Sequence, residues 1–288
     1  MKNGFIIVNY NDSKTVLKLI DNIKNYNIID KIVIVDNCST DDSLNQLKKI
    51  TNEKIQILSN NSNNGYGPGI NLGAKYLKKL YNECNLIISN ADIIIHSEDD
   101  LVKLISELNS HKDTAIVAPV IEEKEGLNRG WKIPTPLQDA ALNLLFIHKF
   151  LRPKLLFYKD EFYKDTVQVD TVSGCFFLMK STILEKIDYF DEQVFLYYEE
   201  NIIAAKLKQI NKKVLLNTTI SVFHNHAITI DKNINRINKF KILKKSQMYF
   251  QIKYNKANIF EKFLLLITNK FSLLILYLTV HKKVYIKK

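Results

Sequence analysis

The sequence predicts an α/β fold built on a mostly parallel, doubly wound sheet. Short apolar runs such as Phe5–Val8 and Ile32–Val35 alternate with stretches whose apolar residues recur at helical spacing, as at Leu101, Leu104 and Leu108. Strands that alternate with helices in this way form mostly parallel sheets. The chain has 288 residues, enough for a sizeable core, and 46% of them are hydrophobic, which argues against a disordered chain.

Each further element follows from the same periodicities. The expected strands are Phe5–Val8, Ile32–Val35, Ile55–Leu58, Leu86–Ile88, Ala115–Ala118, Val167–Val172, Phe176–Met179, Val214–Leu216 and Ile220–Phe223. Helices are expected around Val16 to Ile23, Leu44 to Ile50, Asn71 to Tyr81, Leu101 to Leu108 and Ala140 to Tyr158, with another starting at Tyr197. The alternation stops after Pro119, where residues 122–130 are expected to form a polar loop.

The charge and the cysteines limit the partners and the compartment. The formal net charge is +11, which favours an acidic partner such as a phosphorylated small molecule, an anionic lipid or a nucleic acid. Nucleic acid is not expected, because no helix-turn-helix, RNA-recognition or zinc-finger pattern is present. The three cysteines, Cys38, Cys84 and Cys175, form no closely spaced pair, which indicates a reducing compartment. Because a strand begins at Phe5, no signal peptide is expected, and the predicted location is cytoplasmic.

Two carboxylates follow predicted strands directly. Asp36 ends the second strand, and Asp92 closes the run Ser89-Asn90-Ala91-Asp92 after the fourth. Ligands of open α/β sheets collect beyond the carboxyl ends of the strands, where Asp36 could bind a ribose or a base. Asp92 could hold a divalent cation and, through it, a diphosphate. The alternative is that these side chains only bond their own turns or cap the next segment.

A glycine-rich stretch follows the third strand. Gly65, Gly67 and Gly69 precede Asn71, but their spacing and their place after the third strand do not fit a dinucleotide fingerprint. Glycines there allow backbone N–H groups to approach an anion closely, although a flexible turn explains them equally well.

The second half of the chain contains a pair of glutamates and a pair of histidines that could take part in chemistry. Aromatic residues precede Glu199 and Glu200 and should raise the pKa of at least one carboxyl, which would suit it to take a proton from a hydroxyl group. Acidic residues in a first helical turn are also ordinary partners of the helix dipole. His224 and His226 lie at the end of a strand, on one face if it continues, and either imidazole could complete a metal site with Asp92.

Taken together, these stretches resemble the family 2 glycosyltransferases with the GT-A fold, especially the rhamnosyltransferase-like members that build bacterial cell-surface polysaccharides. The resemblance spans residues 3 to 230. Seven pieces carry it in the same order: Val8-Asn9-Tyr10-Asn11, Val35 to Asp41, Asn64 to Gly73, Ser89 to Asp92, Val172-Ser173-Gly174, Phe190-Asp191-Glu192 with Tyr198-Glu199-Glu200, and His224.

The resemblance implies a role for each matching residue. Asp36, with the backbone near Asn9 and Tyr10, would bind the nucleotide. Asp92 is similar to the second aspartate of the DxD motif and would hold Mg²⁺ or Mn²⁺ on the donor diphosphate. In the same way Ser173 and Gly174 would line the sugar pocket, Glu200 would be the catalytic base, and His224 or His226 the later metal ligand. Gly65, Asn71 and Asn90 belong to the donor-binding stretches.

Three departures from the family pattern stand out. The first position of DxD is Asn90, so Asp92 is the only carboxylate of that motif. The base is Glu200 where the family usually has Asp. The Asp-Leu and Arg that usually follow are Ile202-Ile203 and Lys206 here.

The resemblance implies an inverting, metal-dependent transfer of a hexose (rhamnose, galactose or glucose) from a dTDP- or UDP-sugar to an acceptor hydroxyl, expected on a lipid-linked glycan. The alternative is a degenerate nucleotide- or glycan-binding scaffold. The implied organisation is a GT-A domain over residues 1–230, with a nucleotide half at 1–120 and an acceptor half at 121–230, followed by a helical tail at 231–288.

The tail is both apolar and basic. Between Ile259 and Val280 a long apolar run is interrupted by Asn269-Lys270, and a central lysine opposes membrane insertion. Lysines flank the run, so an in-plane anchor on an anionic membrane surface is expected, with Ala140 to Tyr158 as a second contact. This places the protein peripherally on the inner face of the plasma membrane. The alternative is that the tail packs as core helices.

Overall fold

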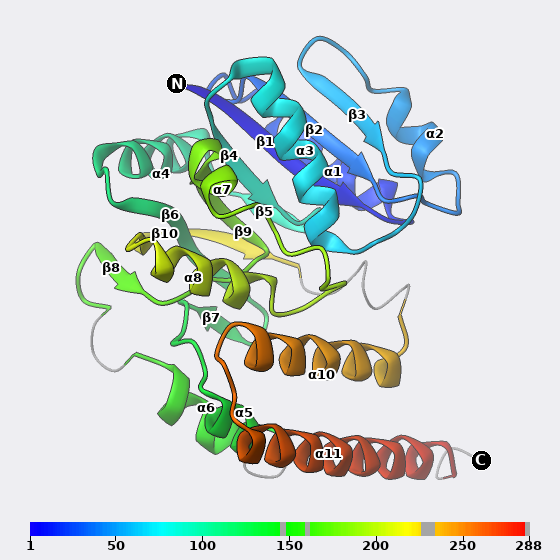
Figure 1. The fold of residues 1–288 in the computed structure, drawn as a ribbon. Coiled ribbons are helices and arrows are strands. Elements are labelled where there is room, and N and C mark those ends of the chain that lie inside the picture. Colours follow the sequence, from blue (N-terminus) through cyan, green and yellow to red (C-terminus); the bar gives the residue numbers. More distant parts are fainter. Residues whose placement is uncertain (145–147, 159–161, 226–233, 286–288) are drawn as a thin grey trace.

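The computed structural model describes residues 1–144, 148–158, 162–225 and 234–285, and side chains up to residue 279. A ten-stranded sheet runs through the molecule in the order β3-β2-β1-β4-β9-β6-β10-β5, with β7 paired to β6 and β8 to β10 (Figure 1). The strands are β1 (Lys2–Asn9), β2 (Lys31–Asp36), β3 (Ile55–Ser59), β4 (Cys84–Ser89), β5 (Ile93–Ile95), β6 (Thr114–Glu123), β7 (Gly126–Asn128), β8 (Thr166–Val169), β9 (Phe176–Lys180) and β10 (Lys213–His224).

Helices cover both faces of this sheet. They are α1 (Ser13–Ile23), α2 (Ser43–Lys48), α3 (Tyr66–Tyr81), α4 (Glu98–Ser110), α5 (Pro136–Leu142), α6 (His148–Leu156), α7 (Ser181–Lys186), α8 (Glu199–Gln209), α10 (Arg236–Lys253) and α11 (Ile259–Tyr285). Alternate strand residues enter different cores: Phe5 packs with α1 and α4, whereas Ile6 packs with α3, α7 and α8. The expected doubly wound, mostly parallel sheet with C-terminal helices is confirmed.

The strand directions decide which residues meet. β3, β2, β1 and β4 are parallel, β9 runs antiparallel between β4 and β6, and β10 is parallel to β6. The carboxyl ends of β1, β2, β4, β6 and β10 therefore lie at one edge, together with the start of β9. Candidate residues from both halves of the chain gather at that edge.

Several element boundaries differ from the sequence prediction. The strand expected at Ala115–Ala118 continues through Pro119 to Glu123 and turns into β7, so residues 122–130 form a hairpin and not a polar loop. The two strands expected between Val214 and Phe223 are one strand, β10, with a register shift between Asn217 and Ser221. That irregularity faces Pro119, which has no N–H to donate to the ladder.

Two helical predictions also need correction. The third helix begins at Tyr66, not near Asn71, because Gly65 at φ 110° turns the chain directly into it. The helix expected over Ala140 to Tyr158 is divided into α5 and α6, and residues 145–147 lie outside the described part of the chain. Thr135 caps α5 with a capping box, and Pro136 occupies its first turn.

The C-terminal helices pack on the body of the molecule. α10 and α11 run side by side, and α5 packs on α11 (Figure 1). Among the helices of the described residues, none combines the length and the hydrophobicity of a membrane-spanning segment. The predicted boundary at residue 230 falls among undescribed residues and stays a prediction.

Candidate active site

Asp36 is fully buried at the end of β2, opposite Asn9 of β1. Its Oδ1 accepts hydrogen bonds from Asn9 Nδ2 (2.7 Å) and the Ser39 hydroxyl (2.6 Å), and its Oδ2 accepts one from the Ser39 N–H (2.9 Å). The Ser39 bonds are those expected of a turn aspartate, and they fix the carboxylate at the edge of the sheet. Tyr10, the residue after Asn9, is half-buried. A nucleotide role for Asn9, Tyr10 and Asp36 stays a prediction.

Gly65 and Asn71 hold a loop that leads to α8. A Cβ on Gly65 would lie 2.2 Å from the Phe195 carbonyl oxygen, and the Tyr66 N–H donates to that oxygen. The Asn71 amide donates to the Phe190 carbonyl (3.0 Å) and accepts from the Phe190 N–H (2.9 Å). Both residues thus fasten the loop 190–195 to α3, contacts that neither sequence interpretation anticipated. Donor binding by these two residues also stays a prediction.

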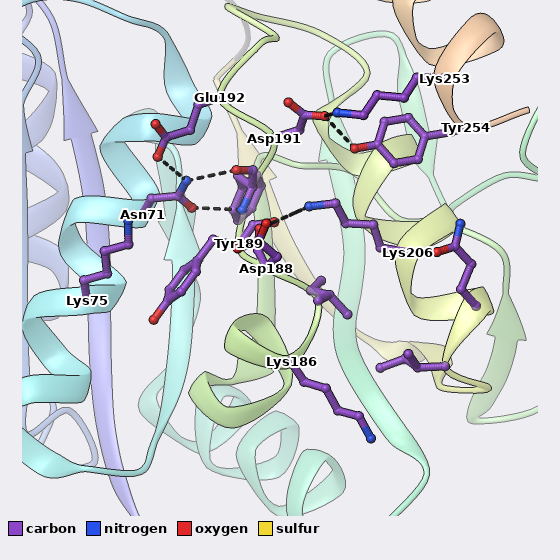
Figure 2. A pocket seen from close by; sticks show the side chains of 14 residues that line it. Asn71, Lys75, Lys186, Asp188, Tyr189, Asp191, Glu192, Lys206, Lys253 and Tyr254 are labelled. Carbon is purple, nitrogen blue, oxygen red and sulfur yellow. Dashed lines mark hydrogen bonds and ion pairs between the residues drawn. The ribbon is translucent and has the colours of Figure 1, made fainter.

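Figure 2 shows the cavity behind this loop, of about 510 Å³. Asn71 faces Glu192 across it, and Lys206 reaches the Asp188 and Tyr189 carbonyls at 3.2 and 2.8 Å. Asp36, Asp92, Glu200 and His224 are not among its lining residues. We therefore conclude that this cavity lies on the outer side of the loop 190–195 and is not the reaction site.

Asp92 and His224 meet where β4 and β10 end. The Nε2 of His224 lies 3.2 Å from Asp92 Oδ1, and both side chains are buried. On its other side, His224 Nδ1 lies 3.7 Å from Glu123 Oε1. Burial lowers the pKa of His224, but the neighbouring Asp92, Cys175 and Glu123 outweigh burial and raise the pKa well above its usual value. Two carboxylates thus make this point attractive to a positive charge.

The donor set partly fits a divalent cation. Within the described ranges, no cluster of three or more His, Cys, Asp or Glu side chains has the arrangement of a metal site. One carboxylate with one imidazole is nevertheless a set that Mg²⁺ or Mn²⁺ accepts when substrate phosphates supply further oxygens. Asn90 lies nearby, its N–H donating to the Cys175 carbonyl at 2.7 Å. His226, the rival ligand, lies outside the described residues.

Glu199 and Glu200 begin α8 after two residues in the left-handed region, Tyr197 at φ 70° and Tyr198 at φ 69°. Glu199 is buried, and its Oε1 has no hydrogen-bond partner among the described residues. Burial raises the pKa of both carboxyls, and the charge of Glu200 raises that of Glu199 further. The predicted raised pKa is therefore present in both members of the pair.

Gly174 lies against the candidate base. A Cβ there would make an ordinary van der Waals contact with Glu200 Oε2, at 3.7 Å, so Gly174 and this carboxylate are neighbours. Ser173 donates to Cys175 Sγ at 3.1 Å, and Cys175 in turn contacts His224. The short 173–175 segment therefore lies between the Asp92–His224 pair and Glu200, as a pocket lining would require.

Helix α10 holds the segment before the base. The Tyr198 hydroxyl donates to Asp139 Oδ2 (2.8 Å) and accepts from Gln247 Nε2 (3.1 Å). Ser246 donates to the Leu196 carbonyl at 2.7 Å. Burial raises the pKa of Asp139 to about 6, against the effect of its hydrogen bonds from Gln251 and Tyr198. The C-terminal region is therefore part of the framework of the candidate site.

Sequence analysis missed Glu123 and this role of α10. Glu123 was placed in a loop because the strand was expected to stop at Ala118. Its position at the end of β6, level with the end of β10, was the available signal. The contacts of α10 join residues about 50 and 110 positions apart, which no local pattern reports.

Residues 5–188 match the family model described as "Glycosyl transferase family 2". The chain therefore belongs to glycosyl transferase family 2, and it is a glycosyltransferase with the GT-A fold. It is 26% identical over 226 residues to the low-salt glycan biosynthesis hexosyltransferase Agl10 of Haloferax volcanii, covering 78% of this chain and 67% of that protein.

Solved structures share the fold. GalNAc-T7 with UDP, GalNAc and Mn²⁺ aligns with a TM-score of 0.57 at 18% identity, covering 78% of this chain and 44% of that one. The mannosyltransferase PcManGT of Pyrobaculum calidifontis with GDP-Man and Mn²⁺ aligns with a TM-score of 0.57 at 14% identity. The alignment covers 94% of this chain and 72% of that one. S. aureus TarS with UDP aligns with a TM-score of 0.54 at 14% identity, and the alignment covers 92% of this chain and 70% of that one. This chain thus spans less than half of GalNAc-T7.

Proposed function

We propose that this glycosyltransferase is an inverting, metal-dependent enzyme that moves a hexose from a nucleoside-diphosphate donor to an acceptor hydroxyl. The observation that carries the proposal is the buried Asp92–His224 pair at the same sheet edge as Asp36 and the Glu199–Glu200 pair. The similar structures crystallised with UDP or GDP-Man, two of them with Mn²⁺, support a nucleotide-sugar donor and a divalent metal. Rhamnose, galactose and glucose from dTDP or UDP remain the candidate donors.

In this proposal, the residues divide the work. Asp36 and the adjacent backbone of Asn9 and Tyr10 bind the nucleoside, with the turn around Asn90 beside them. Asp92 and His224 would hold Mg²⁺ or Mn²⁺, which would supply Lewis-acid stabilisation of the diphosphate. Glu200 accepts the proton of the acceptor hydroxyl as its oxygen attacks the anomeric carbon and the bond to the diphosphate breaks.

The raised pKa of Glu200 suits this role. A base whose pKa lies nearer to neutrality accepts a proton from a hydroxyl more readily than an ordinary exposed carboxylate. Gly174 leaves space beside Glu200 Oε2, where an acceptor oxygen has to approach. Glu199, the preceding residue, is buried, and its raised pKa favours the neutral form, so we assign it to orientation.

The alternative function is a catalytically inactive scaffold that binds a nucleotide or glycan. It is favoured by Asn90 at the first DxD position and by Ile202 and Ile203 after the acidic pair. The two functions differ in turnover. We expect purified protein with Mn²⁺ to release nucleoside diphosphate slowly from at least one of dTDP-rhamnose, UDP-galactose and UDP-glucose, and chelation to stop the release. Binding of a nucleotide sugar without any release would favour the scaffold.

We further propose that α11 docks on an anionic membrane surface. One face of α11 packs on α5, where Leu265 and Ser272 are buried. The opposite face exposes Ile259, Phe260, Phe263, Leu266, Ile267, Phe271, Leu274 and Leu278, and Phe263 alone is 61% exposed. These positions recur every three or four residues and form one apolar stripe interrupted by Lys270. The lysines of α10 beside it, such as Lys239 and Lys241, complement acidic headgroups.

Surface docking would bring the enzyme to a lipid-linked acceptor on the inner face of the plasma membrane. We expect the full chain to float with liposomes containing phosphatidylglycerol, and the variant Phe263→Glu/Leu274→Glu to remain in the soluble fraction. Ile252→Glu, at an exposed position of α10, is the matched control and should still float. Equal flotation of all three proteins, or flotation of none, would contradict the docking.

A further inference from the structure

A cavity beside the candidate active site has no role in the mechanism above. It measures about 910 Å³ and lies between the β6–β7 hairpin, the end of α6 and residues 162–163. Its polar lining includes Arg129, Arg152 and Glu123, and its aromatic lining consists of Phe157, Tyr158, Phe162 and Tyr163. Such a mixture of rings and a few charged groups is typical of sites that bind small molecules or sugars.

Two lining residues connect the cavity to the reaction site. Glu123 Oε1 lies 3.7 Å from His224 Nδ1, the imidazole paired with Asp92. Arg152 lies close enough to Glu200 for its positive charge to act on that carboxyl. Asp92, His224 and Glu200 do not line the cavity, but Glu123 and Arg152 place it next to the reaction site. A second substrate bound in this cavity would lie next to the reaction site.

Two of the aromatic rings pack against each other, and the other two are exposed. Tyr158 and Phe162 form an edge-to-face pair with centroids 6.4 Å apart, and the Tyr158 hydroxyl accepts the Asp170 N–H at 2.7 Å. The other two rings of the lining are more accessible: Tyr163 is 79% exposed and Phe157 is 42% exposed. Exposed rings beside a fixed aromatic pair can contact the C–H face of a sugar ring.

The guanidinium groups are positioned by the same rings. Arg129 lies 5.6 Å from the Phe162 centroid, and Arg152 lies 5.8 Å from that of Phe157. Both side chains are exposed and keep planar forks of N–H donors that match phosphate or carboxylate oxygens. Of the two lining carboxylates, Glu123 interacts with His224, and Glu125 lies in the exposed β6–β7 turn. The guanidinium groups thus determine which charged group the cavity favours.

We propose that this cavity binds the acceptor, and that the acceptor is a glycosyl group carrying an oxyanion, a phosphate or a carboxylate, next to the sugar that is modified. Phe157 and Tyr163 contact the sugar ring, and Arg129 and Arg152 bind the oxyanion. The assignment rests on the proposed glycosyl transfer. The arrangement suits a lipid-phosphate-linked acceptor in particular, because α6 joins α5, which packs on the apolar helix α11 (Figure 1).

The test compares acceptors that share a glucose-type ring and an octyl chain and differ in whether they carry an oxyanion. The full chain is given the donor from which it releases nucleoside diphosphate fastest, together with octyl glucoside, octyl glucuronide or glucose joined to octanol through a phosphate. We expect kcat/KM for at least one charged acceptor to exceed that for octyl glucoside at least tenfold. Arg129→Gln should reduce the ratio of kcat/KM for the charged acceptor to kcat/KM for octyl glucoside about tenfold. Tyr163→Ala should raise KM for charged and neutral acceptors alike. Arg236→Gln, an exposed arginine at the start of α10, is the matched control and should keep the ratio.

The outcomes separate the two proposals. A protein that binds donors but releases nucleoside diphosphate from none of them contradicts the proposed function. A protein that releases it, but prefers octyl glucoside, transfers to none of the three acceptors, or keeps its ratio in Arg129→Gln, overturns the acceptor assignment alone. Preference for the phosphate-linked acceptor over the glucuronide identifies phosphate as the bound oxyanion, and the reverse preference identifies carboxylate.

Discussion

Asp92→Asn is expected to lower the rate of transfer by at least a hundredfold, about 3 kcal/mol of transition-state stabilisation, while the protein stays folded. Asn keeps the shape of Asp92 and can still accept a hydrogen bond from His224, but it removes the only carboxylate of the DxD-like motif. An amide oxygen binds a hard divalent cation more weakly than a carboxylate does. The loss should therefore be accompanied by weaker binding of Mn²⁺ in the presence of nucleoside diphosphate.

The measurement is nucleoside-diphosphate release across a range of Mn²⁺ concentrations, with circular dichroism to verify folding. Asp99→Asn, an exposed carboxylate in the first turn of α4, is the matched control and should behave as wild type. If Asp92→Asn keeps more than about a tenth of the wild-type rate, which is ~1.4 kcal/mol, Asp92 is not the ligand.

Glu200→Gln should reduce turnover by a factor of at least a hundred and leave donor affinity nearly unchanged. The substitution keeps the size of the side chain and removes the group that accepts the acceptor proton. In the wild type, turnover should fall as pH drops through the raised pKa of this carboxyl, because only the ionised form accepts a proton. Glu199→Gln, in the adjacent buried position, is the comparison.

The two variants distinguish the members of the pair. Because Glu199 Oε1 is buried without a hydrogen-bond partner among the described residues, Glu199→Gln should retain substantial activity. Donor affinity is measured from the protection of thermal stability by UDP or dTDP. An inactive Glu199→Gln beside an active Glu200→Gln would reverse the assignment.

The sheet was predictable because its strands are buried on both faces. Phe5–Val8 and Leu86–Ile88 are continuous apolar runs that only a buried strand of this length explains, and the structure has β1 and β4 there. The polar residues that end such runs, Asp36 and Asp92, were therefore placed correctly at the carboxyl edge. The sequence suggested that His224 or His226 could join Asp92, and the structure places His224 there, 3.2 Å from Asp92 Oδ1.

Other features were not predictable from local patterns, for physical reasons. Pro119 interrupts a strand that continues because β10 shifts its register opposite it, and so Glu123 was expected in a loop. The contacts of α10 with Tyr198 and Asp139 are side-chain hydrogen bonds between distant segments. They depend on tertiary packing, which neither periodicity nor capping patterns record. The role of His226 remains as the sequence left it, a prediction.

The central claim is that this glycosyltransferase displaces a nucleoside diphosphate with inversion, using Glu200 as the base. Its most direct test needs no known acceptor, because water can replace the acceptor hydroxyl during slow donor hydrolysis. Proton NMR of the first sugar released, recorded before mutarotation, reports its anomeric configuration. The account predicts that an α-linked donor yields the β-sugar first, with Mn²⁺ required and Glu200→Gln inactive. Release of the α-sugar first from an α-linked donor would contradict it.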